Sequence, residues 1–127
     1  MADGAASGAW TDAATIAPIH FNAVITDIST AETVYIPIPY AGTVNKITTV
    51  LGGAIGTSDA TITLKNSAAA SMGTVTVATA ISAAGDVDSN ASLSNNTVTA
   101  NDYITVETNG ASTNAVKLWV TVSMTRS

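Results

Sequence analysis

The C-terminal segment of this chain alternates apolar and polar side chains more regularly than any other part of the sequence. The apolar positions, and then the positions between them, are Val116, Leu118, Val120, Val122 and Met124, and Lys117, Trp119, Thr121, Ser123 and Thr125. A repeat of two residues places these two sets on opposite faces of a β-strand. We therefore expect a long, half-buried strand here, with Trp119 on the face that points away from the core.

Shorter segments of the same kind run through the rest of the chain. Extended structure is predicted over residues 15–28, 32–38, 43–51, 60–66, 73–81 and 102–108, with a further short strand near Leu93. In the segment 73–81 the pattern puts Ile81 on the same face as Val75 and Val77. Clusters of Gly, Asn, Ser and Asp separate these segments, as is typical of turns. Residues 68–72 offer one helical turn and no more.

Short strands spaced about 8 to 12 residues apart predict an all-β fold. We expect an antiparallel β-sandwich, jelly-roll-like and of about eight strands, with a fibronectin- or immunoglobulin-like sandwich as the alternative. A chain of 127 residues suits one domain, which we place at residues 15–127. Residues 1–14 are small apart from Trp10 and predict an extended N-terminal arm, in which Trp10 docks on a neighbouring surface.

The charge balance argues against several classes of partner. The formal net charge is −5, and the 4 basic residues, Lys46, Lys65, Lys117 and Arg126, are scattered along the chain. Binding to phosphates requires clustered Lys and Arg, so we expect neither nucleic acid nor a membrane as a partner. The N-terminal residues have neither the basic nor the apolar part of a secretory signal, and there is no cysteine. The simplest expectation is a protein made and assembled in a cytoplasm.

No set of residues in the sequence has the pattern of a catalytic centre. His20 is the only histidine, and it lies in an alternating stretch between Ile19 and Phe21. Such a position is typical of a strand-face histidine with a satisfied hydrogen bond, whereas an enzyme would need it beside a carboxylate in a cleft. The glycine-rich segment 52–56 lacks the Lys-Ser/Thr and the helix of a phosphate loop. We therefore expect no enzymatic activity, no catalytic residues and no cofactor.

One spacing in the sequence partly matches a metal site. Asp86, Asp88 and Asn90 alternate like the first three ligands of a calcium loop. The full loop also requires Gly at its sixth position and Glu at its twelfth, and these positions hold Ala91 and Thr97. A polar turn accounts for the same residues. Asp86, Asp88 and Asn90 are therefore retained as metal candidates, although no metal is expected.

The predicted strand surfaces are polar but almost uncharged. Charged residues make up 10 % of the sequence, against about 25 % in an average soluble domain. Hydroxyl and amide groups can pair across a contact, so such a surface costs little to cover with protein. We infer that neighbouring protein covers much of it. The aromatic residues Tyr35, Tyr40, Tyr103 and Trp119 fit either packing between subunits or a platform on which sugars stack.

The segment from Gly73 to Arg126 has a distinctive order of strands and turns. It runs GTVTVATAISAAGDVDSNASLSNNTVTANDYITVETNGASTNAVKLWVTVSMTR: a Thr/Val strand, a Gly-Asp loop, the stretch NTVTANDYITVE, the turn TNGAST and a long closing strand. This segment, with a fainter counterpart in GTVNKI at residues 42–47, resembles small jelly-roll-like virion proteins of tailed bacteriophages. It is most similar to the decoration, or cement, proteins of the capsid, and similar stretches occur in phage tail and fibre proteins.

The resemblance implies a structural virion protein with no catalytic motif. Members of this family commonly form trimers at threefold or quasi-threefold positions of the capsid lattice, where they clamp capsid subunits against internal pressure. On this interpretation the chain is a trimeric cement subunit on the capsid exterior, assembled in the host cytoplasm, with the major capsid protein and copies of itself as partners. The residues we expect at these interfaces are Trp10, Pro18, Tyr35, Tyr40 and Trp119. The alternative is a tail- or fibre-associated module that recognises a host-surface glycan or receptor.

Overall fold

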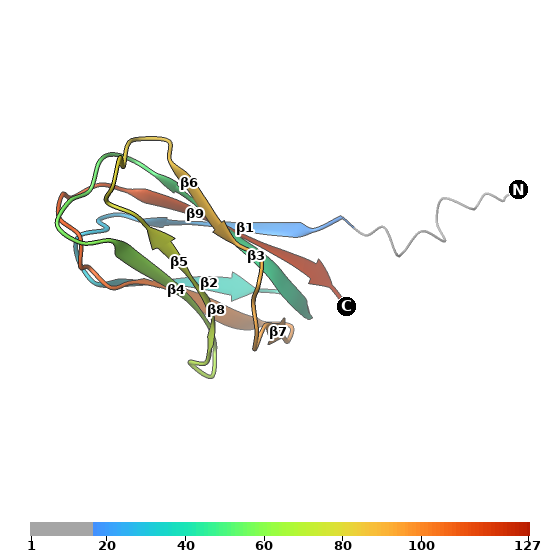
Figure 1. The fold of residues 1–127 in the computed structure, drawn as a ribbon. Coiled ribbons are helices and arrows are strands. Elements are labelled where there is room, and N and C mark those ends of the chain that lie inside the picture. The colour runs from blue at the N-terminus through green and yellow to red at the C-terminus, as the bar shows by residue number, and fades with distance from the viewer. Residues whose placement is uncertain (1–16) are drawn as a thin grey trace, which may run out of the picture.

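The computed structural model describes residues 17–127, which form two antiparallel β-sheets packed face to face (Figure 1). The strands are β1 (Ile19–Ile25), β2 (Glu32–Ile38), β3 (Gly42–Leu51), β4 (Ala60–Asn66), β5 (Ser71–Val77), β6 (Val87–Asn90), β7 (Thr97–Val98), β8 (Asp102–Thr108) and β9 (Leu118–Arg126). One sheet has the order β1-β9-β3-β6, with the short β7 also pairing with β3, and the other has the order β2-β8-β4-β5. We call them the β9 sheet and the β8 sheet.

This strand order is that of a jelly roll. The strand pairs are nested along the chain: β1 pairs with β9, β2 with β8, β3 with β6, and β4 with β5. Four such nested pairs, rolled up so that they alternate between two sheets, make a jelly roll. The predicted all-β, jelly-roll-like sandwich is therefore confirmed, and the short β7 is a ninth strand. The predicted arm at residues 1–14 lies outside the described residues.

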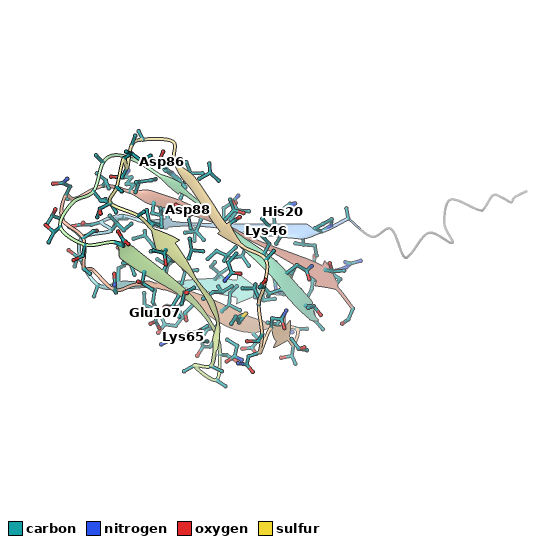
Figure 2. The ribbon with its side chains drawn as sticks, in the orientation of Figure 1. His20, Lys46, Lys65, Asp86, Asp88 and Glu107 are labelled. Atoms are coloured by element: carbon teal, nitrogen blue, oxygen red, sulfur yellow. The ribbon has the colours of Figure 1, made fainter. Side chains whose placement is uncertain are left out.

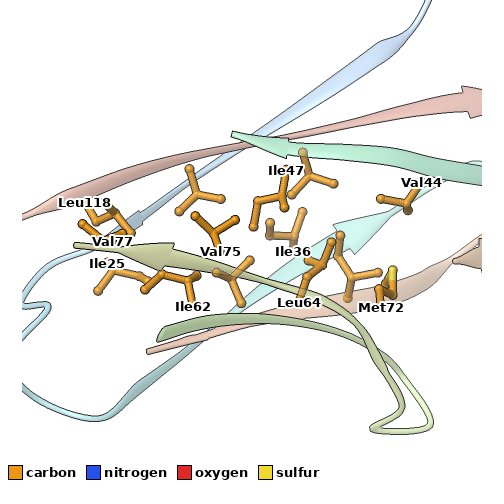
Figure 3. Close-up of a cluster of buried hydrophobic side chains, with 14 of the residues drawn as sticks. Ile25, Ile36, Val44, Ile47, Ile62, Leu64, Met72, Val75, Val77 and Leu118 are labelled. Atoms are coloured by element: carbon orange, nitrogen blue, oxygen red, sulfur yellow. The ribbon is translucent and has the colours of Figure 1, made fainter. Parts of the chain in front are cut away.

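The core lies between the two sheets and is apolar (Figure 3). The inward side chains of β9, at Leu118, Val120, Val122 and Met124, are at most 1 % exposed, as their alternation predicted. Leu118 lies in register between Ile25 of β1 and Leu51 of β3, and the β8 sheet contributes Ile62, Leu64 and Val106 from the other side. Because apolar residues face inward at every second position, the outward faces are left with the intervening residues.

Three local predictions are wrong, and in the first two a side-chain hydrogen bond breaks the expected pattern. The strand predicted over residues 73–81 ends at Val77, since the carboxylate of Asp59 accepts from both the N–H and the hydroxyl of Thr79 and turns the chain. Residues 68–70 form a hairpin turn instead of a helical turn, because Oδ1 of Asn66 accepts from the backbone N–H groups of residues 68 and 70, and residues 71 and 72 already belong to β5. Leu93 lies between β6 and β7 and packs on the core without joining either strand. Within residues 17–127 no helix is long and apolar enough to cross a membrane.

Candidate protein interface

An apolar row crosses the outward face of the β9 sheet from edge to edge. The register pairs Val24 with Trp119, Trp119 with Val50, and Val50 with Val87. Directly opposed residues on neighbouring strands share a face, with Cβ atoms about 4.5–5.5 Å apart. Three of these side chains are well exposed: Val24 at 38 %, Trp119 at 47 % and Val87 at 63 %. We call Val24, Trp119, Val50 and Val87 the apolar row; neighbouring apolar side chains of this kind on a sheet surface are candidates for a contact surface.

The rest of this face is polar and nearly uncharged. Cross-strand hydrogen bonds join its side chains: His20 Nδ1 with Ser123 Oγ (2.9 Å), Thr121 Oγ1 to Asn22 Oδ1 (2.8 Å) and Asn45 Nδ2 to Thr125 Oγ1 (2.6 Å). Among the outward-facing residues of these four strands, Lys46 is the one that carries a full charge, and it lies near His20 (Figure 2). Side chains that already pair with one another lose little when a partner excludes water from them.

Ile81 extends this surface beyond the sheet. Its side chain is 98 % exposed, and it lines a hollow together with Val87 at the edge of the apolar row. Its backbone φ is 52°, a left-handed conformation in which a β-branched residue is strained. The next residue holds this shape, since Ser82 exchanges hydrogen bonds with the backbone N–H and C=O of Ile55. The prediction that Ile81 faces the core is therefore wrong, and a strained, exposed apolar side chain is typical of a functional contact.

The residues predicted at interfaces do not gather in one place. Trp119 lies in the apolar row, and Pro18 is exposed just before β1. Tyr35 lies on the opposite, β8 sheet, whereas Tyr40 lies in the turn between β2 and β3, with the guanidinium carbon of Arg126 5.1 Å from its ring centre. Trp10 lies outside the described residues. Of the four aromatic residues considered for a sugar platform, the structure brings together two, Tyr35 and Tyr103, whose ring centres are 5.5 Å apart.

Sequence analysis missed Val24, Val50 and Val87 as interface residues. Each of them is apolar but falls on the polar face of its own strand. For Val24 and Val50, which lie in predicted strands, an apolar residue at an outward position was a usable signal; for Val87 it was not, since no strand was predicted at residues 87–90. The row itself was not predictable, because it depends on how four segments that are distant in the sequence align.

The metal candidates do not converge on one point. The carboxylate of Asp86 accepts from the N–H of Ala83, and the amide of Asn90 donates to the C=O of Thr74 and accepts from the N–H of residue 92. Asp88 lies on β6 opposite the buried Thr49, on the inward side of the sheet edge. Within residues 17–127 no group of three or more carboxylate, imidazole or thiol side chains is placed to hold a metal ion.

The position of Asp88 makes its pKa a test of this region. Burial beside the core raises the pKa of its carboxyl above the usual 3.8, and the charge of Asp86 raises it further. The free energy of unfolding therefore falls as the pH rises from below 3.8 through the raised pKa of Asp88, because the carboxyl must then ionise in a partly buried place. We expect Asp88→Asn to raise the free energy of unfolding at pH 7 and to have almost no effect at pH 3, as measured by urea denaturation at both values. A calcium-dependent stabilisation that this substitution abolishes would instead assign the residue to a metal site.

A hollow of about 500 Å³ lies beside the start of β8, lined by Phe21, Pro37, Ile38, Pro39, Asn101 and Asp102. Its one titratable group is the carboxylate of Asp102, which accepts hydrogen bonds from Ser67, Thr99 and the N–H of Tyr103. These hydrogen bonds lower the pKa of Asp102, and the bond from the backbone N–H of Tyr103 has the largest effect. Asp102 is therefore a fixed hydrogen-bond acceptor and a poor proton carrier at neutral pH. His20, exposed on β1, hydrogen-bonds Ser123 as expected of a strand-face histidine.

No protein-family model matches the chain, and no curated protein matches its sequence. A chain in a solved structure of Bacillus endospore appendages, described as a novel family of disulfide-linked pili, is similar at 18 % identity and a TM-score of 0.41. The alignment covers 87 % of this chain and 88 % of that one. At these values the likeness carries no conclusion about the fold or function of this chain, whose own strand order defines its fold.

Proposed function

We propose that this chain is a non-enzymatic structural subunit of a tailed-bacteriophage virion, a cement protein that decorates the capsid exterior as a homotrimer. The observation that carries the proposal is the apolar row on an otherwise polar and nearly uncharged sheet face. A Trp flanked by aliphatic side chains on a nearly uncharged surface has the composition of an interface core, from which charged residues are depleted. Many such contacts repeated over a capsid give strong attachment, even where each is weak.

Two further properties support the proposal. The segment from Gly73 to Arg126 resembles phage decoration proteins, and the jelly roll is a common architecture of viral capsid domains. The net charge of −5 fits a subunit outside the shell, since such a subunit does not contact the genome. Fold by itself does not define function, so the interface residues must carry the test.

The test combines oligomeric state with attachment to capsids. We expect the wild-type protein to be a trimer by light scattering and to sediment with purified heads of the phage that encodes it. Trp119→Ser removes the largest side chain of the apolar row and should weaken one or both contacts about tenfold or more. Ile81→Asn is a second variant, which removes the exposed apolar side chain beside the apolar row and should weaken the same contacts. It should fold well, because Asn accepts a left-handed backbone.

Each outcome decides the proposal. A Trp119→Ser protein that becomes monomeric makes the row a contact between subunits, and one that stays trimeric but no longer sediments makes it the capsid contact. The matched control is Tyr103→Ser, which removes an aromatic ring 40 % exposed on the opposite sheet and should change neither property. A wild-type monomer that ignores capsids would overturn the proposal, as would normal assembly and sedimentation of both variants.

A further inference from the structure

The outward face of the β8 sheet carries a small polar hollow lined by two aromatic rings that pack against each other. The hollow has a volume of about 170 Å³ and is lined by Tyr35, Tyr103, Lys65, Glu107 and Thr105, among others. The ring planes of the two tyrosines are tilted by 55°, with Tyr35 66 % and Tyr103 40 % exposed. Figure 2 shows Lys65 and Glu107 close together, on a different part of the molecule from His20 and Lys46.

The register of three strands builds this arrangement around Thr105. Tyr35 of β2 lies opposite Thr105 on one side, and Lys65 of β4 lies opposite it on the other. Tyr103 and Glu107 precede and follow Thr105 by two residues on β8, so all five share one face. Thr105 is 7 % exposed and forms the floor, and the four larger side chains surround it.

One rim of the hollow is fixed by the turn after β4. The hydroxyl of Tyr103 lies 3.5 Å from the carbonyl oxygen of Ser67, and the hydroxyl of Ser67 donates to the carboxylate of Asp102 at 2.9 Å. Asn66 closes the same turn through its side-chain amide and also donates to the carbonyl oxygen of Asn95. A rim tied at several points loses little freedom when a ligand binds, which favours affinity.

The charges of the hollow limit what it can bind. Lys65 Nζ lies 3.0 Å from Glu107 Oε1, so the pair is neutral overall and offers no excess positive charge to an anion. A purely apolar ligand would cover these two charged groups without replacing their water, which is costly. A ligand with both donors and acceptors on its edge and C–H groups on its face satisfies the ion pair, the hydroxyl of Thr105 and the tyrosine rings together.

We infer that this hollow is a binding site for a neutral carbohydrate, in which one pyranose ring stacks against Tyr35 and Tyr103 while its hydroxyl groups hydrogen-bond Lys65 and Glu107. A volume of about 170 Å³ is smaller than the roughly 300 Å³ at which pockets for drug-sized ligands begin, so it suits one ring of a longer glycan. The site lies on the sheet opposite the apolar row and does not depend on the proposed role in capsid decoration.

The experiment is affinity gel electrophoresis of the full chain in gels containing neutral polysaccharides: dextran, a β-glucan, a galactan and a mannan. At least one of them should retard the wild-type protein, and the double substitution Tyr35→Ala/Tyr103→Ala should weaken that retardation about tenfold or more. Tyr35→Phe keeps the ring and should retain binding. Lys65→Met, which breaks the ion pair but keeps the aliphatic stem, should weaken binding while the sheet stays folded by circular dichroism.

Tyr40→Ala is the matched control, since Tyr40 is 43 % exposed, close to the value for Tyr103, but lies in the β2–β3 turn. It should leave retardation unchanged. A gel containing the anionic polysaccharide alginate should retard the protein no more than a blank gel. The inference is overturned if no neutral polysaccharide retards the wild type, if retardation survives in the double variant, or if alginate is preferred.

Discussion

Replacing Leu118 by alanine is expected to lower the free energy of unfolding by about 2–5 kcal/mol, a large share of the total of about 5–15 kcal/mol for an ordinary domain. Leu118 is fully buried and lies in register between Ile25 and Leu51, both at most 1 % exposed. Its neighbours are held by two β-ladders, so they cannot move far enough to fill the cavity. Urea denaturation followed by circular dichroism measures the change.

The control for this substitution is Thr125→Ser, at an exposed position on the same strand that keeps a hydroxyl for Asn45. It should change the free energy of unfolding by less than about 0.5 kcal/mol, as most surface substitutions do. If the two variants were equally stable, β9 would not be an interior strand of the β9 sheet.

Gly110→Ala is expected to destabilise the protein by about 2–5 kcal/mol, the sum of backbone strain and a steric clash. Gly110 has a φ of 68°, and a Cβ atom built on it would lie 2.4 Å from the backbone nitrogen of Ala31 and 2.8 Å from the carbonyl carbon of Thr30. The β8–β9 loop packs directly on the β1–β2 loop here, so the added methyl group must displace backbone. Thermal and urea unfolding both measure the loss.

Gly85→Ala separates strain from clash. Gly85 has a φ of 91°, but a Cβ atom on it would meet nothing within 4 Å. This variant should therefore show only the cost of the left-handed backbone, about 1–2 kcal/mol. The difference between the two variants measures the contact between the loops, and equal losses would mean that no such contact exists in solution.

The fold was predictable where a strand's own alternation decides its place. Strands β2, β4 and β8 occupy the predicted residues, because each alternates cleanly between turn-forming neighbours. The prediction failed at Ile81. The alternation of Val75 and Val77 continues to Ile81 in the sequence, but β5 ends at Val77. The chain turns away there because the carboxylate of Asp59, about twenty residues earlier, accepts two hydrogen bonds from Thr79. A hydrogen bond between distant residues leaves no trace in local periodicity.

The candidate interface was predictable only in part, for a similar reason. The outward orientation of Trp119 follows from the alternation of apolar and polar residues along its own strand. Its alignment with Val24 and Val50 depends on the register of β9 with β1 and β3, and no local pattern encodes that register. The pairing of Tyr35 with Tyr103 likewise depends on the alignment of β2 with β8. Surface sites that span several strands of a jelly roll are visible only once the strands are paired.

The nested pairing of the strands also determines when the molecule can fold. Ile19 at the start of β1 lies opposite Met124 near the end of β9, and Glu32 of β2 lies opposite Thr108 of β8. During synthesis β1 and β2 leave the ribosome long before the strands that complete their ladders, and contacts so distant along the chain form slowly. In that interval they are unpaired edges that other nascent chains can join. We therefore expect the yield of correctly folded protein in a cell to depend on how soon β9 follows β1 out of the ribosome.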